Sequence, residues 1–180
     1  MAQYTTTQFK EHFLTLGLNL KITWLNTQLE NMKNKNNLSF DEIVGNLFHK
    51  MLISDLGVIS LGLLPQNCEL LNEKQLEKRT ILQVNRMINI GTKHKKKEKE
   101  TKHRCLKFLL TDGIQEMSGF EYHRIPTIKI DDDNNIPGFK VVVTNAEIRH
   151  GHFLLSQNNC KKLGGYVQSL KDLRMNQQQL

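Results

Sequence analysis

The sequence predicts an α+β fold in which an N-terminal three-helix module precedes a small β-barrel that ends in a C-terminal helix. Two observations support this prediction. Apolar residues recur at helical spacing before Pro65, and after this proline the period changes to the alternation of half-buried strands. We therefore predict two domains, a helical module over residues 1–66 and a barrel domain over residues 67–180.

The helical module shows three amphipathic segments. The clearest begins at Ser39, where Ser39 and Glu42 have the S-x-x-E spacing of a capping box. An apolar stripe follows it without a gap: Phe40, Ile43, Val44, Leu47, Phe48, Met51 and Leu52. Ile22, Leu25, Leu29 and Met32 predict a second helix, Phe9 and Phe13 a shorter first one, and residues 33–37 a polar loop.

The barrel domain shows five strand-like segments. In "ILQVNRMINI" apolar residues alternate with Gln83, Asn85, Met87 and Asn89, so we expect inward side chains at Leu82, Val84, Ile88 and Ile90. A second strand runs from Cys105 to Thr111 into a two-residue hairpin turn at Asp112-Gly113, because this pair supplies the positive φ that such a turn needs. A third strand passes through Phe120 and Tyr122.

The last two strands and a closing helix follow a Pro137-Gly138 turn. Val141, Val143 and, after a bulge, Ile148 are expected to face inward, and "HFLL" forms the fifth strand. The segment from Ser156 to Met175 is interpreted as a helix kinked at Gly164-Gly165. Five short strands with one closing helix indicate a five-stranded OB-type Greek-key barrel.

Composition limits the class of protein. The chain has 180 residues, of which 38% are hydrophobic, and no run reaches the ~18 apolar residues of a membrane span, so we expect no membrane association. Three widely spaced cysteines, Cys68, Cys105 and Cys160, favour free thiols over disulfides or a zinc module. A net charge of +7 favours an acidic partner such as nucleic acid.

The strongest charge cluster is the basic segment "GTKHKKKEKETKHR" between the first two predicted strands. It can contact DNA or a protein partner, serve as a nuclear import signal, or be a solvated loop. The proposed partner or DNA contacts are Lys93, Lys95, Lys96, Lys97, Lys99, Lys102 and Arg104. Phe120, Tyr122 and Phe139 are the aromatic residues left for base stacking, because Phe108 and Phe153 are assigned to the core.

Motifs for catalysis or metal binding are weak. Glu121 and Tyr122 have no second carboxylate or nucleophile at a useful spacing, and we interpret Tyr122 as a packing residue. His150 and His152 flank Gly151 in a turn without a further ligand, and "DDDNN" at residues 131–135 does not have the glycine and glutamate of a calcium loop. We therefore predict a non-enzymatic protein without metal or cofactor.

The motif string "LLTDGIQEMSGFEYHRIP", "IPGFKVVV", "IRHGHFLLSQNN" and "LGGYVQSL" resembles, in order and spacing, the N-terminal region of the RecQ-mediated genome instability protein 1 family. It is also similar to the related region of the Tudor-domain partner of topoisomerase III beta. Upstream, "MLISDLGVISLGLLP" looks like the family segment that joins the helices to the barrel, so the resemblance covers residues 23–173.

The resemblance implies a nuclear, non-catalytic subunit. It would bind topoisomerase III and a RecQ-family helicase, contact DNA within that complex, and promote double Holliday junction dissolution in recombination and replication repair. In this family the loop between the first two barrel strands is expected to enter the topoisomerase gate. Here the loop is short and basic. Two alternatives stay open: an independent single-stranded nucleic-acid-binding OB protein, and a partner of a topoisomerase III beta-type enzyme.

The family signature is expected to be structural. Its members here are Thr111, Asp112, Gly113, Glu121, Tyr122, Pro126, Pro137, Gly138, Gly151, Asn159, Leu163, Gly164 and Gly165. Gly113 and Gly138 occupy turns, and the Gly164-Gly165 pair is expected to let the closing helix bend over the barrel. Replacing these glycines should destabilise the fold rather than remove a site.

Overall fold

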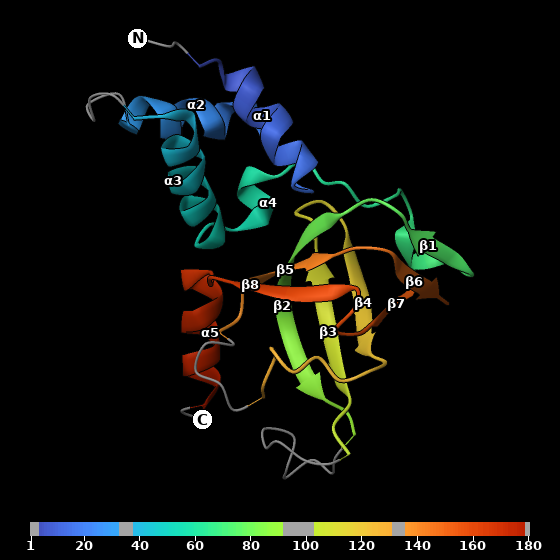
Figure 1. The fold of residues 1–180 in the computed structure, drawn as a ribbon. Helices are drawn as coiled ribbons and strands as arrows, with labels where there is room; N and C mark the ends of the chain where they lie inside the picture. The colour runs from blue at the N-terminus through green and yellow to red at the C-terminus, as the bar shows by residue number, and fades with distance from the viewer. Residues whose placement is uncertain (1–3, 33–37, 92–102, 131–135, 179–180) are drawn as a thin grey trace.

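The computed structural model describes residues 4–32, 38–91, 103–130 and 136–178, with the first helices at one end of a curled sheet (Figure 1). The N-terminal helices are α1 (Thr6–Thr15), α2 (Ile22–Met32), α3 (Phe40–Leu52) and the short α4 (Leu56–Ile59). The first three lie at the predicted segments, and α4 was not predicted. No helix in these described ranges is long and apolar enough to span a membrane.

Capping boxes fix where α1 and α3 begin. At α3, the Ser39 Oγ accepts the Glu42 N–H at 3.3 Å, and a Glu42 carboxylate oxygen accepts the Ser39 N–H at 2.8 Å. The Ser39 N–H and the Ser39 hydroxyl both donate to the Glu42 carboxylate, which favours its ionised form and lowers the pKa of Glu42. Thr5 and Gln8 form the same motif at α1, which the sequence analysis missed.

The sheet has eight strands rather than the five predicted. They are β1 (Lys74–Leu76), β2 (Thr80–Asn89), β3 (Leu106–Thr111), β4 (Glu116–Glu121), β5 (Phe139–Val143), β6 (Ala146–Arg149), β7 (His152–Leu155) and β8 (Cys160–Gly164). Their order is β1-β6-β7-β4-β3-β2-β5-β8, and only the β4–β7 pair is parallel. Because β2 pairs with β5 and the preceding β1 pairs with the following β6, the sheet curls back on itself.

Local backbone features account for the additional strands. Asn145 has a φ of 52°, and the turn there splits the predicted fourth strand into β5 and β6. The predicted helix from Ser156 to Met175 is wrong in its first half. Residues Cys160–Gly164 pair with β5 as β8, because β5 has a free edge there, and α5 covers only Gln168–Gln178.

A β-bulge changes which side of β2 faces the barrel interior. The pairing with β3 shifts between Val84 and Arg86, so the alternation reverses beyond this point. Leu82 and Val84 are buried in the core as predicted, but Met87 packs there instead of Ile88, and Ile90 is 45% exposed. The prediction of inward Ile88 and Ile90 was therefore wrong.

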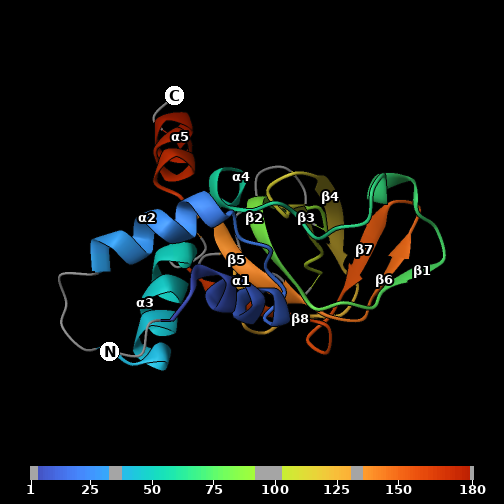
Figure 2. The same cartoon turned by 90° about the horizontal axis from the view of Figure 1, so that it is seen from above.

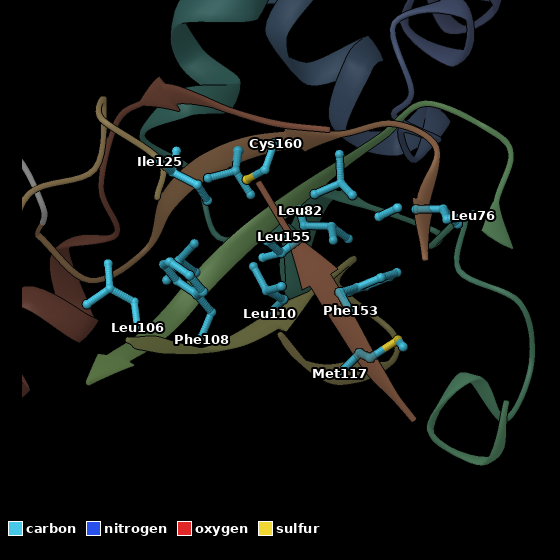
Figure 3. Close-up of a cluster of buried hydrophobic side chains, with 14 of the residues drawn as sticks. Leu76, Leu82, Leu106, Phe108, Leu110, Met117, Ile125, Phe153, Leu155 and Cys160 are labelled. Atoms are coloured by element: carbon cyan, nitrogen blue, oxygen red, sulfur yellow. The ribbon is translucent and has the colours of Figure 1, made fainter. Parts of the chain in front are cut away.

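Apolar side chains from every part of the sheet fill the barrel. Phe108 and Phe153 lie among them, as predicted, and Figure 3 shows both with Leu106, Leu110 and Leu155. Cys68, Cys105 and Cys160 are free thiols, also as predicted. The loop after β4 contributes Ile125 and Ile128 to this core.

The helical module packs on the outside of the same barrel. Its core of Phe9, Phe13, Leu47, Met51 and their neighbours includes Ile81 of β2 and Val142 of β5. Figures 1 and 2 show these helices gathered beside β2, β5 and β8, away from β6 and β7. β2 and β5 are consequently buried on both faces where they meet the helices.

Candidate functional site

The predicted contact loop joins β2 to β3, and most of it lies outside the described residues. Lys93, Lys95, Lys96, Lys97, Lys99 and Lys102 all fall in residues 92–102, so their placement stays a prediction. The structure describes the stem of the loop, from the end of β2 to Gly91 and from His103 to the start of β3.

Asn89 closes this stem. Its Oδ1 accepts the N–H groups of Gly91 at 3.1 Å and Cys105 at 3.0 Å, and the Ile90 N–H donates to the Cys105 carbonyl at 2.8 Å. A β-carbon on Gly91 would lie 1.9 Å from the His103 carbonyl oxygen, so the two sides of the stem approach too closely for another residue. The loop therefore leaves the barrel through a narrow, hydrogen-bonded neck.

Arg104 anchors the second side of the stem inside the protein. Its Nε donates to Glu121 Oε2 at 2.8 Å, its Nη2 pairs with Glu121 Oε1, and the same Nη2 donates to the Ile125 carbonyl at 3.1 Å. The Ile125 N–H returns a 2.9 Å hydrogen bond to Glu121 Oε1. Both charged side chains are only 2% exposed. Arg104 is thus an internal anchor, which corrects its assignment as a DNA or partner contact.

Glu121 and Tyr122 take opposite sides of the end of β4. Glu121 points inward because Arg104 offers a buried charge partner, whereas Tyr122 is 65% exposed, with 4.6 Å between the centres of its ring and the His123 ring. The interpretation of Tyr122 as a packing residue was therefore wrong. Arg104 and Glu121 are 17 residues apart, so no local sequence pattern identifies the pair.

Asp112 ties the β3–β4 hairpin to the segment that leads from α4. Its Oδ2 accepts the N–H groups of Leu63 and Leu64, both at 2.7 Å, and its Oδ1 accepts those of Ile114 at 2.9 Å and Gln115 at 2.8 Å. The strands pair up to Thr111 and Glu116, so the loop has four residues rather than the predicted two. The Oδ1 hydrogen bonds close this longer loop from inside, and the Oδ2 hydrogen bonds tie it to the distant segment.

Gly113 and Gly165 lie where a side chain would collide with backbone. Gly113 has a φ of +99°, and a β-carbon there would lie 2.3 Å from the Leu56 carbonyl oxygen. Gly165 has a φ of +80°, and its β-carbon would lie 2.1 Å from the Leu52 carbonyl oxygen at the end of α3. Both glycines thus allow the barrel to touch the backbone of the helical module. The bend at Gly164-Gly165 links β8 to α5, not two halves of one helix.

The other signature residues are dispersed through the barrel. The Asn159 side chain accepts the Ser156 N–H at 2.8 Å and donates to the Leu154 carbonyl at 2.9 Å, and Thr111 Oγ1 donates to the Gln115 carbonyl at 2.7 Å. Leu163 packs against the core of the helical module. Gly164 ends β8. The remaining positions all lie at turns, and they are Pro126, which is exposed, Pro137, Gly138 and Gly151.

Sequence reasoning missed a buried lysine between the two parts of the chain. Lys140 of β5 has no exposed surface, and its Nζ donates to the carbonyls of Ser54 and Gly138, each at 2.7 Å. Burial lowers the pKa of Lys140 to about 7, although the nearby Asp55 charge acts in the opposite direction. A lysine in "FKVVV" gives no signal of this role, since its acceptor at Ser54 is 86 residues away.

Comparison with known proteins assigns the barrel. Residues 51–178 match the family model described as "RMI1, N-terminal OB-fold domain". This chain belongs to the RMI1 family. The match begins at the end of α3 and contains the whole sheet, so the curled sheet is an OB-fold domain, with eight strands instead of five. It also contains the loop stem and the Arg104–Glu121 pair.

Curated relatives carry the name RecQ-mediated genome instability protein 1. The chain is 32% identical to the Arabidopsis thaliana protein over 130 residues, which are 71% of this chain and 20% of that protein. For the Oryza sativa subsp. japonica protein, identity is 29% over 171 residues, 93% of this chain and 21% of the relative. For the Gallus gallus protein, identity is 29% over 184 residues, which cover 87% of this chain and 29% of the relative. The chain thus spans less than a third of each relative.

Proposed function

We propose that this chain is a non-catalytic accessory subunit of a nuclear complex of topoisomerase III and a RecQ-family helicase. In that complex it promotes dissolution of double Holliday junctions and so maintains genome stability. The family match over residues 51–178 carries this proposal, because it covers the barrel and both sides of the β2–β3 loop. The name of the relatives, which includes RecQ-mediated genome instability, supports the choice of pathway.

The loop stem supports a role for the β2–β3 loop as the contact with the topoisomerase. An internal ion pair and the Asn89 hydrogen bonds hold both ends of the loop against the barrel. A fixed stem limits the positions that the loop can reach. The loop therefore loses less conformational entropy when it binds a partner. We propose that the lysines of residues 93–102 meet either the topoisomerase gate or DNA held by it.

A dissolution assay tests the proposal. The organism's topoisomerase III and RecQ helicase are given a double-junction substrate, with and without the chain, and non-crossover product is measured. Wild type should increase the product, and joint charge reversal of Lys95, Lys96 and Lys97 should weaken this effect. A matched control reverses three exposed lysines elsewhere, Lys50, Lys78 and Lys161, with the same change in net charge.

Two results would contradict the proposal at different levels. If folded wild-type chain leaves product formation unchanged, the accessory role is wrong. If the loop variant stimulates dissolution as well as the control variant does, the accessory role stands but the loop assignment is wrong. Thermal unfolding of each variant shows whether a loss of stimulation reflects a loss of fold.

A further inference from the structure

One outer face of the barrel carries an aromatic and basic row that the proposed function does not use. On β3, β4 and β7 the buried residues Phe108, Met117 and Phe153 face the core, so their neighbours in the alternation face outward. These outward residues include Lys107 on β3, Phe120 and Tyr122 at β4, and His152 on β7. In Figures 1 and 2 the helices of the N-terminal module lie beside β2, β5 and β8, not beside β7.

Three of these side chains form a row across adjacent strands. Lys107 is the register partner of Phe120, and its Nζ lies 5.5 Å from the centre of the Phe120 ring. On the other side, the His152 ring meets Phe120 edge-on, with 5.0 Å between ring centres and an angle of 82°. Burial and the Lys107 charge lower the pKa of His152, which favours the neutral form of its ring.

Tyr122 extends this row with an accessible ring. It lies two residues beyond Phe120, just past the end of β4, and is 65% exposed. A large aromatic ring left open to solvent offers a stacking surface to a planar group. Base–aromatic stacking is a main source of affinity for single nucleic-acid strands and tolerates any base sequence.

The charge on this face favours a polyanion over a neutral ligand. Arg86 is exposed on β2, opposite Leu109 of β3. Lys107 lies two residues from Leu109 along β3, on the same face of the sheet. Glu116 is at the far end of β4, where Asn85 Nδ2 donates to it at 3.0 Å, and Glu121 faces inward to Arg104. OB folds bind oligonucleotides over the second and third barrel strands, which correspond here to β3 and β4.

We propose that this face binds a single nucleic-acid strand, with Tyr122 stacking on a base and Lys107 and Arg86 neutralising phosphates. Phe120 and His152 form the platform beneath that strand. The surface is separate from the contact with topoisomerase III proposed above, and it would act in the chain alone. It assigns a ligand to Tyr122, for which the family signature implied only a structural role.

Fluorescence anisotropy with labelled (dT)20 and an abasic strand of equal length tests this face. The abasic strand keeps the phosphates but offers nothing to stack, so wild type should bind (dT)20 more tightly. Tyr122→Ala should weaken (dT)20 binding about tenfold while abasic binding stays unchanged. Lys107→Gln should reduce the slope of log affinity against log salt by about 0.7. The control Lys161→Gln, an exposed lysine on β8, should change neither quantity.

The outcomes distinguish binding at this face from binding by the basic loop, and they do not depend on the proposed function. Equal affinity of wild type for both strands, or a Tyr122→Ala variant that keeps the preference for (dT)20, overturns the proposal. Tyr122 is exposed at the end of a strand, so its replacement should leave the unfolding temperature unchanged, which circular dichroism checks. Binding to topoisomerase III without DNA tests the accessory role independently of these results.

Discussion

The interior of the barrel and its contact with the helical module are both closely packed, but they are built differently. The interior consists almost entirely of aliphatic and aromatic side chains, among them Phe108, Phe139 and Phe153. At the module contact, apolar residues such as Ile81 and Val142 are joined by buried polar groups, including Gln83 and Lys140. Gln83 Oε1 accepts the Leu56 N–H at 3.0 Å, and its Nε2 donates to Asp55 at 3.0 Å.

This difference shows what a strand requires when both of its faces are buried. A strand with one face in water needs only alternation, whereas β2 and β5 bury both faces, and their outer polar groups must find partners in the helices. The backbone partners are the Ser54 carbonyl and the Leu56 N–H, which lie where α3 ends and α4 begins. The contact is therefore specific in position, and its stability should depend on a few polar atoms and glycines rather than on apolar area alone.

The largest expected effect concerns the buried ion pair at the loop stem. Arg104→Met would leave the Glu121 carboxylate buried without its cation, which should lower the free energy of unfolding by roughly 3–5 kcal/mol. The double variant Arg104→Met with Glu121→Met should recover most of this loss, since no buried charge remains. Urea unfolding of both variants measures the coupling. A loss below about 1 kcal/mol for the single variant would contradict a buried anchor.

A matched pair of glycines isolates the close contact between the barrel and α3. Gly164 and Gly165 both have positive φ, but a β-carbon would meet nothing within 4 Å at Gly164 and would lie 2.1 Å from the Leu52 carbonyl oxygen at Gly165. Gly164→Ala should cost only backbone strain, about 1 kcal/mol, and Gly165→Ala about 1–3 kcal/mol more. Thermal unfolding of the two variants gives the difference. Equal costs would mean that the helical module moves away without penalty.

The smallest expected change in stability at neutral pH concerns Lys140. It is also the most informative about the contact between the barrel and the helical module. Its folded pKa of about 7 lies below the unfolded value near 10.5, so the unfolded chain binds more protons between these values and stability should rise with pH. From pH 7 to pH 9 this contribution is on the order of 2 kcal/mol. Below pH 7 it is constant, because both states are protonated.

Lys140→Met should remove that rise while retaining most of the packing. The measurement is urea unfolding at pH 7 and pH 9 for wild type, Lys140→Met and the control Lys161→Met, whose lysine is exposed. Wild type and the control should gain the same stability over this interval, and Lys140→Met should gain less. An identical pH dependence in all three proteins would contradict the lowered pKa, because it would mean that Lys140 keeps its proton up to pH 9 in the folded chain.

Local signals allowed the helices and most strands to be predicted. Ser39 and Glu42 mark the start of α3, and Leu106, Phe108 and Leu110 alternate in β3, because neighbours in the chain decide both features. Pairing across the fold decided the rest. The bulge after Val84 depends on the register with β3, and β8 exists because it completes the edge of β5.

The candidate site was less accessible to sequence reasoning. The lysines of the β2–β3 loop form an obvious charge cluster, but Arg104, adjacent to them, is an internal anchor. Its partner Glu121 is 17 residues away in the sequence, and only the fold brings the two side chains together. The outward row at Lys107, Phe120 and His152 likewise requires the register of three strands, of which one pair is parallel.

The central claim is that this barrel and its loop serve a topoisomerase III, and direct binding tests it. The organism's topoisomerase III is mixed with the full chain in the absence of DNA and analysed by size-exclusion chromatography with light scattering. We expect a stable complex with one copy of each protein, which weakens when Lys95, Lys96 and Lys97 are reversed in charge. Separate elution of the two folded proteins across the concentration range would contradict the account.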